Sequence, residues 1–168
     1  DDVMDEVREQ AERDYQLASG LSQDVETDDN VFRQTTARLP WLLIGMLGGI
    51  GNSMILGNFD STFAAHPEMA LYIPLIGGTG GNVGTQSSAL VVQGLANSSL
   101  NAENTFKQVL KESVVALINA TIISMLVYIY NFIRFGATAT VSYSVSISLF
   151  AVVMFASIFG TLVPMTLE

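Results

Sequence analysis

The stretch Tyr72-Ile-Pro-Leu-Ile-Gly-Gly-Thr-Gly-Gly-Asn-Val-Gly-Thr-Gln86 combines one proline, five glycines and two amides inside an uncharged run from Met69 to Ala102. A membrane helix needs roughly 20 residues without a central charge, because such a charge costs about 2.5–3.5 kcal/mol. The run is therefore predicted to cross a membrane. Its glycines and amides suit lipid poorly, and backbone of this kind persists at membrane depth where it is buried in protein or lines a water-filled path.

Three further uncharged runs flank this stretch, namely Leu39 to Phe59, Ser113 to Ile133 and Phe135 to Leu167. The 168 residues are 49% hydrophobic and only 14% charged, with a mean hydropathy of +0.42, which is unusual for a soluble domain. The expected fold is an all-α integral membrane protein. Its four transmembrane helices are expected near residues 39–59, 69–96, 113–134 and 140–165.

Residues 138–148 alternate strictly between Ser or Thr and apolar side chains, which is the pattern of a β-strand. The alternation continues without a break into the apolar stretch Leu149 to Val163. An open strand edge in lipid would leave backbone groups unpaired, at a cost of several kcal/mol each. We therefore expect a helix here.

Acidic residues gather at the start of the chain. Eleven of the 16 lie within the first 30 residues, beside two arginines, so this segment carries the whole net charge of −9. Such acidity argues against a nucleic-acid partner, because no basic groove is left to neutralise phosphates. The chain has no cysteine and one histidine, so any metal is expected to be held by oxygen atoms or by the single His66.

Apolar residues of the first segment recur on one helical face, with acids on the other. This pattern predicts an amphipathic acidic helix over residues 1–20, with Gly20 as its C′ residue. Residues 21–38 are expected to be a linker and the entry to the membrane. Residues 39–168 are expected to form the transmembrane domain.

Orientation follows from the basic residues of the short loops. Arg33 and Arg38 precede the first span and Lys107 and Lys111 lie between the second and third, whereas only Arg134 lies on the opposite side. The N-terminus and the 97–112 loop are therefore expected to be cytoplasmic, and the 60–68 and 134–139 loops external. Residues 101–112 are expected to lie along the inner interface. The expected location is the cell (inner) membrane, crossed several times.

One line along the second span carries only small and amide residues at helical spacing: Gly78, Asn82, Gln86, Ala89 and Gln93. One interpretation is a packing seam, in which the amides bond to a neighbouring helix. The other is a path for a cation that keeps its water shell, such as Mg²⁺, because Mg²⁺ dehydrates reluctantly and is held through waters by few protein oxygens. A phosphate-binding loop is disfavoured, since no Lys-Ser/Thr pair follows the glycines.

These residues resemble a known family. The run Pro74 to Gln86, preceded by Arg38-Leu-Pro-Trp41 and by an Asp-Asp-Val-x-Asp helix, is similar to the MgtE family of magnesium channels and transporters. The resemblance implies a homodimer of five-helix protomers, with a pore between them lined by the second and fifth helices. It also implies cytosolic N and cystathionine-β-synthase (CBS)-type domains, joined to the membrane part through an acidic plug helix that residues 1–20 resemble. This sequence lacks the fifth helix and the cytosolic domains.

The candidate site residues fall into two groups. The pore lining is expected to include Pro74, Gly78, Gly81, Asn82, Gly84, Thr85, Gln86 and Gln93. Mg²⁺, or another divalent cation, is expected at Asn82 through water, at the outer mouth by Asp60, at the inner mouth by Glu112, and on the first helix by Asp2, Asp5, Glu9 and Asp14. Asp60 also fits a solvated loop charge, Glu112 a carboxylate that complements a helix dipole, and the acidic helix a merely solvated surface.

The predicted function is divalent cation transport, most simply as a Mg²⁺ channel gated by Mg²⁺ on the acidic segment. A membrane scaffold without transport is the alternative. An intramembrane enzyme is disfavoured because the one histidine lies in an external loop, away from the serines of the spans. Selectivity among Mg²⁺, Mn²⁺, Co²⁺ and Ca²⁺, and the choice between channel and carrier, stay open.

Overall fold

The computed structural model describes residues 2–22, 25–96, 105–136 and 139–166. Within its helices it leaves out the side chains of residues 2, 3, 5, 8, 11, 12, 14, 18, 95, 96 and 105. The chain divides into two compact units, Asp1–Asp60 and Ser61–Glu168, which are described separately. Every regular element in the described ranges is a helix, as expected for an all-α protein.

The first unit contains α1 (Asp2–Ala18) and α2 (Val31–Gly57). Helix α1 ends at Ala18, and Gly20, two residues further on, has a φ of 83° in the left-handed region expected of a C′ glycine. The amide of Leu21 donates to the carbonyl of Gln16 at 3.0 Å, and that of Gly20 donates to Leu17 at 3.0 Å. This pair of bonds is the Schellman arrangement that ends many helices.

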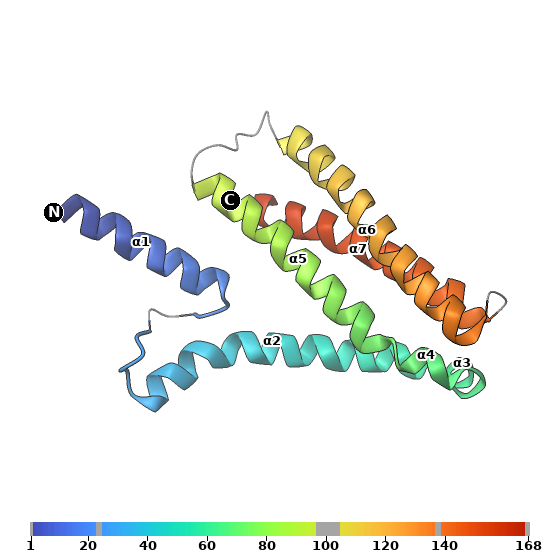
Figure 1. Cartoon of the computed structure of the whole chain (residues 1–168). Coiled ribbons are helices and arrows are strands. Elements are labelled where there is room, and N and C mark those ends of the chain that lie inside the picture. The colour runs from blue at the N-terminus through green and yellow to red at the C-terminus, as the bar shows by residue number, and fades with distance from the viewer. Residues whose placement is uncertain (1, 23–24, 97–104, 137–138, 167–168) are drawn as a thin grey trace. The chain divides into compact units, whose positions relative to one another are not determined.

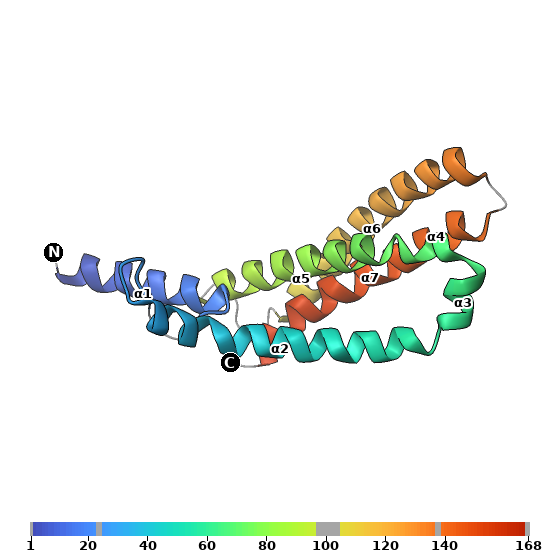
Figure 2. The same ribbon diagram turned by 90° about the horizontal axis from the view of Figure 1, so that it is seen from below.

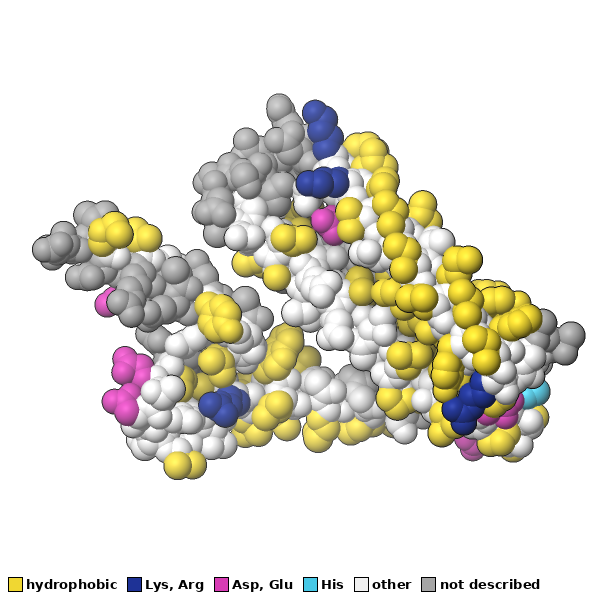
Figure 3. Space-filling model, viewed as in Figure 1, with side chains coloured by type: hydrophobic (Ala, Val, Ile, Leu, Met, Phe, Trp, Pro, Cys, Tyr) yellow, Lys and Arg dark blue, Asp and Glu magenta, His cyan; other side chains and the backbone are white. Residues whose placement is uncertain are grey.

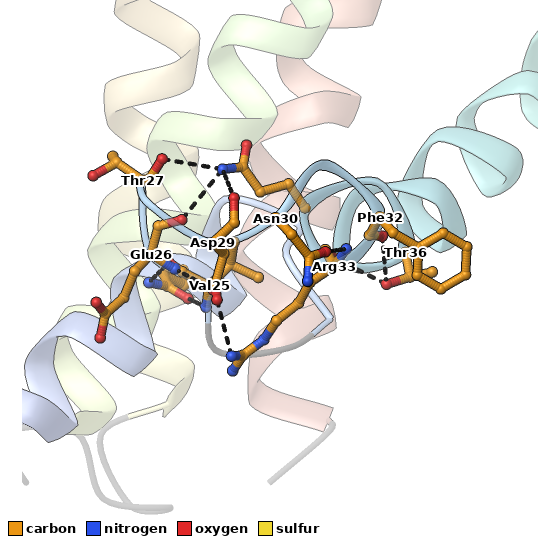
Figure 4. Close-up of polar contacts among 10 residues, drawn as sticks. Val25, Glu26, Thr27, Asp29, Asn30, Phe32, Arg33 and Thr36 are labelled. Atoms are coloured by element: carbon orange, nitrogen blue, oxygen red, sulfur yellow. Dashed lines mark hydrogen bonds and ion pairs between the residues drawn. The ribbon is translucent and has the colours of Figure 1, made fainter.

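The connection between α1 and α2, residues 19–22 and 25–30, is hydrogen-bonded and is called the elbow below (Figure 4). The side-chain amide of Gln16 clamps the Val25 backbone, donating to its carbonyl at 2.9 Å and accepting from its amide at 3.0 Å. Both the amide and the hydroxyl of Ser22 donate to the Ala37 carbonyl. The described part of the predicted linker therefore has a defined conformation.

Helix α2 has 27 residues and begins eight residues before the predicted start at Leu39. Asn30 caps it, because its side-chain oxygen accepts from the Arg33 amide at 2.9 Å. Asp29 adds an ion pair with Arg33 at 3.0 Å. The charge-free run marks only the part suited to lipid, whereas the helical hydrogen bonds begin at the cap. The predicted boundary was therefore wrong.

The second unit contains α3 (Asp60–Ala65) apart from its first residue, together with α4 (Pro67–Ala70), α5 (Ile73–Ala96), α6 (Thr105–Phe135) and α7 (Thr140–Thr166). Helix α7 packs against both α5 and α6 (Figure 1, Figure 2). Leu149 and Val153 of α7 are fully buried with Ala120 of α6. Because α7 touches both neighbours, it forms the centre of this unit.

Helices α5 and α7 approach closely at glycines. A Cβ atom built on Gly160 would lie 2.5 Å from the Gly84 carbonyl oxygen, and one on Gly80 would lie 2.6 Å from a methyl carbon of Val152. Real Cβ atoms do not approach other atoms so closely. The prediction that glycines of the second span allow close backbone contact is therefore confirmed at this crossing.

Two other predicted boundaries were wrong. The helix expected from residue 69 begins at Ile73, after the short α4, so Pro74 lies in the first turn, where its missing N–H costs nothing. Helix α6 begins at Thr105, so residues 105–112 continue the third predicted span rather than forming a separate interfacial segment; residues 101–104 lie outside the described ranges. Helix α7 includes residues 140–148, as predicted in spite of their alternating pattern.

Three of the described helices are long and apolar enough to cross a membrane, over Val31–Gly57, Phe106–Phe135 and Thr140–Thr166. Hydrophobic side chains cover much of α6, and basic side chains lie towards its ends (Figure 3). Helix α5 has 24 residues, about 36 Å at 1.5 Å per residue, which exceeds a hydrocarbon core of about 30 Å. Its glycines and polar residues lower its hydropathy, so the fourth span stays a prediction.

Candidate functional site

Helix α5 has two distinct faces. Gly80, Ser87 and Val91 are buried, and this face packs against α7. The line predicted from the sequence lies on the other face, where every member is exposed: Gly78, Asn82, Gln86, Ala89 and Gln93. This line, called the amide face below, is therefore left uncovered by the helices of its own unit.

The amides of this face have unused bonding capacity. No hydrogen bond joins the side chain of Asn82, Gln86 or Gln93 to any other residue in the described part of the chain. An amide in lipid without a partner is costly. The amide face is therefore suited to water or to another protein surface, and poorly suited to lipid.

The remaining predicted lining residues divide between the two faces. Gly81 and Thr85 are exposed beside the amide face, and the Thr85 hydroxyl donates to the Gly81 carbonyl at 2.9 Å. Pro74 is exposed in the first turn of α5. Gly84 is half-buried against α7, with the Ala156 carbonyl oxygen 3.6 Å from a Cβ built on it. Gly84 therefore serves the crossing with α7 in this unit.

Glu112 lies on the α7 side of the unit, away from the amide face. It is only 7% exposed, and one oxygen of its carboxylate accepts a long hydrogen bond, 3.5 Å, from the Ser87 hydroxyl. The Ser87 hydroxyl is in turn 3.1 Å from that of Ser157, so α5, α6 and α7 each contribute one oxygen-bearing side chain. Sequence reasoning missed Ser87 and Ser157. No pattern within α5 or α7 pointed to them, because their meeting depends on the glycine crossing.

A second buried polar contact joins the turn before α5 to α6. The Tyr72 hydroxyl donates to the side-chain oxygen of Asn131, whose residue is 0% exposed. The Asn131 amide nitrogen has no partner among the described residues. Sequence reasoning also missed this pair, although an asparagine in an apolar span is a signal, since it must find a partner away from water.

The remaining predicted ligands do not meet in a cluster. Asp60 is exposed at the start of α3, and His66 pairs with Glu68 at 3.3 Å. Glu9 is exposed on α1, while the side chains of Asp2, Asp5 and Asp14 lie outside the described part. Within the described residues, no three His, Cys, Asp or Glu side chains are close enough to hold a metal ion.

Two long apolar helices, α6 and α7, pack against each other, and α2 of the first unit is also long and apolar enough to cross a membrane. Three such helices are typical of a multi-pass membrane protein. The family model described as "MgtE: Divalent cation transporter" matches residues 73–168. The chain therefore belongs to the MgtE family. This family is one of transporters, which agrees with the prediction that the chain is not an enzyme.

Three curated relatives, each named "Magnesium transporter MgtE", align with the whole chain. The proteins of Bacillus subtilis and Enterococcus faecalis are 28% and 26% identical over 168 residues. The protein of Thermus thermophilus is 31% identical over 174 residues. In each case the alignment includes 100% of this chain and 37% of the relative. The chain thus spans little more than a third of the length of these relatives.

Proposed function

We propose that this chain forms part of the membrane domain of a divalent cation transporter whose cargo is Mg²⁺. The observation that carries the proposal is the amide face of α5, whose side chains are exposed and unbonded within their own unit. Neutral amide oxygens can hold the water shell of a small cation without stripping it, and Mg²⁺ keeps several waters when bound. The relatives' printed name, magnesium transporter, supports Mg²⁺ as the cargo.

The path is proposed to run between two copies of the protein. A polar face on each copy would then meet its equivalent, which is the usual geometry of a two-fold dimer. The fifth helix and the cytosolic N and CBS-type domains belong to this proposal as parts of the longer protein. The count of basic loop residues supports a cytoplasmic N-terminus in the cell membrane. Asp60, exposed at the opposite end, would concentrate cations at the outer mouth.

The acidic segment is proposed to gate the path. Asp2, Asp5 and Glu9 lie at i, i+3 and i+7 of α1, so their positions share one side of the helix, with Asp14 further along. Two or three carboxylates can share a hydrated Mg²⁺ and lose their mutual repulsion. High cytosolic Mg²⁺ would let the segment dock and close the path, and low Mg²⁺ would release it.

Replacement of Asn82 by leucine in the full-length protein tests the path. The variant should lose most Mg²⁺ uptake into sealed proteoliposomes that contain a Mg²⁺-sensitive dye, because one amide of the path is replaced by an apolar side chain. Expression level and oligomeric state, checked by size exclusion with light scattering, should stay unchanged.

The matched control is Asn119→Leu, which makes the same change at an exposed position of α6 away from the amide face. Its uptake should equal that of the unmodified protein. Unchanged flux in Asn82→Leu would refute the assignment of the path. Absence of flux in the unmodified protein would favour the scaffold alternative.

A further inference from the structure

The buried cluster of Glu112, Ser87 and Ser157 is not used by the proposed path. It lies where the second half of α5, the start of α6 and the second half of α7 meet, beside the close contact of Gly84 with Gly160. Ser87 is 4% exposed and Ser157 is 2% exposed, so the cluster is as enclosed as the apolar core. A carboxylate buried this deeply is stable only if hydrogen bonds or a nearby positive charge compensate for its lost hydration.

The protein supplies little to stabilise this carboxylate. Its one hydrogen bond within the described residues is the 3.5 Å contact with the Ser87 hydroxyl. Neither Lys107 nor Lys111, which are exposed on the same helix, lies within 4.0 Å of it. The packed parts of α5 and α7 carry no charged residue at all. An isolated carboxylate away from water is unfavourable unless a counter-charge is present.

We propose that a dehydrated monovalent cation, Na⁺, binds between Glu112, Ser87 and Ser157. Its charge would match that of the single carboxylate, so the closed site would be neutral. Three helices would each provide an oxygen ligand, and the ion would tie α5 and α6 to α7. The site is separate from the amide face and does not depend on Mg²⁺ being the transported ion.

The spacing between the Ser87 and Glu112 oxygens suits an ion of this size, whereas the Ser87 and Ser157 oxygens would have to separate by a few tenths of an ångström. Na⁺ has nearly the radius of Ca²⁺, which binds oxygen at about 2.3–2.6 Å, so two ligands at a right angle lie about 3.3–3.7 Å apart. The Ser87 hydroxyl oxygen is 3.5 Å from the carboxylate oxygen and 3.1 Å from the Ser157 oxygen. The larger K⁺ would require the oxygens to spread further than Na⁺ does, against helices held together by the contact of Gly84 with Gly160.

Mg²⁺ fits this cluster less well than Na⁺. One carboxylate would leave a full positive charge uncompensated in the helix bundle. Mg²⁺ also demands near-octahedral geometry and gives up its waters reluctantly, and a site with so little exposed surface offers scant room for them. The cluster therefore favours a monovalent cation that has lost its water shell. The amide face, by contrast, is proposed to favour a divalent cation that keeps its waters.

Thermal unfolding of the purified full-length protein tests this proposal. Midpoints are measured by scanning calorimetry in NaCl, in KCl and in N-methyl-D-glucamine chloride, at one pH and ionic strength and without divalent ions. Above the dissociation constant, each tenfold rise in Na⁺ should raise the midpoint of the full-length protein by about 1–2 °C, because only the folded state holds the site. KCl should have a smaller effect, and the organic cation none.

Three variants locate the effect. Glu112→Gln should abolish the dependence on Na⁺. Ser157→Ala, which removes one ligand, should raise the required Na⁺ concentration about tenfold. Ser113→Ala is the matched control, since the Ser113 hydroxyl donates to the Val109 carbonyl at 2.7 Å and takes no part in the cluster. It should keep the full Na⁺ dependence.

Binding of ²²Na⁺ to the folded protein gives a second measurement, and with Ser157→Ala it keeps the test decisive even if Glu112→Gln fails to fold. Equal midpoints in Na⁺ and in the organic cation, a Na⁺ effect that persists in Glu112→Gln, or an unchanged Na⁺ requirement in Ser157→Ala would each overturn the proposal. Loss of Mg²⁺ uptake in Asn82→Leu has no bearing on these outcomes, so the two proposals fail separately.

Discussion

Gly160 sets the distance between α7 and α5. Any side chain at this position meets the Gly84 backbone, and backbone cannot rotate away as a flexible side chain can. The contact also brings the Ser87 and Ser157 hydroxyls to within 3.1 Å of each other. One glycine therefore controls both the helix crossing and the buried polar cluster beside it.

Gly160→Ala should separate α5 from α7 and destabilise the protein by about 1–3 kcal/mol, the usual cost of overpacking. The measurement is the midpoint of thermal or denaturant unfolding. Gly77→Ala, on the same helix as Gly84 but with nothing within 4 Å of the added Cβ, should change the midpoint little. Equal stability of the two variants would mean that the crossing adjusts freely.

Tyr72→Phe should destabilise the protein by about 1–2 kcal/mol, because it leaves the Asn131 side-chain oxygen without its donor in a buried site. Combining it with Asn131→Leu should cost less than the sum of the two single changes, since the double variant leaves no polar group unpaired. Unfolding midpoints of the four proteins complete the cycle. Additive effects would show that the two side chains are not coupled.

For the secondary-structure elements, the sequence predicted helix positions correctly where residues close together in the chain determine them. The end of α1 was predictable because Gly20 needs a positive φ, and α7 because an unpaired strand cannot lie in lipid. The starts of α2 and α6 were not, since charges such as Lys107 mark where lipid ends and not where helical hydrogen bonds end. The cluster of Ser87 with Ser157 was out of reach, because it joins residues 70 positions apart in the sequence.

The acidic helix α1 carries the prediction for gating. In the full-length protein, raising Mg²⁺ through the millimolar range should protect residues 1–30 from a protease, because neutralised carboxylates allow the segment to dock. Asp2→Asn combined with Asp5→Asn should move the midpoint of protection to higher Mg²⁺. The hydrogen bonds between Gln16 and Val25 hold the elbow in one conformation. Docking of α1 is therefore proposed to move α2 through the elbow.

Ser19→Ala is the control for that experiment, because the Ser19 hydroxyl donates to the Tyr15 carbonyl at 2.8 Å and has no other hydrogen bond among the described residues. Its Mg²⁺ midpoint should match that of the unmodified protein. Protection that is independent of Mg²⁺ in all three proteins would exclude this form of gating and would leave the proposed path intact.

For the whole molecule, the proposed function brings the amide faces of two copies together. This chain contains no cysteine, so a single introduced thiol reports on its own surroundings without background from these 168 residues. The proposed two-fold arrangement places the same residue of both copies near the shared axis. For an exposed residue of α6, no close approach between the two copies is expected.

Gln86→Cys, in a full-length protein otherwise free of cysteine, should form a disulfide-linked dimer on mild oxidation in the membrane, because the amide faces of two copies are proposed to meet. Ile118→Cys, exposed on α6, should give little cross-linking under the same conditions. Electrophoresis without reductant separates the two species. If Ile118→Cys cross-linked and Gln86→Cys did not, the interface would lie on α6 and the proposed meeting of the amide faces would be refuted.

The low hydropathy of α5 also has a consequence during biosynthesis. A nascent segment enters the bilayer from the translocon according to its own transfer free energy, and its glycine and amide residues make that free energy less favourable for α5 than for the three apolar spans. Helices α6 and α7 are much more apolar and follow it along the chain. Integration of α5 should therefore wait until α7 has been synthesised and can cover its buried face, so that the cotranslational order of insertion departs from the order of the sequence.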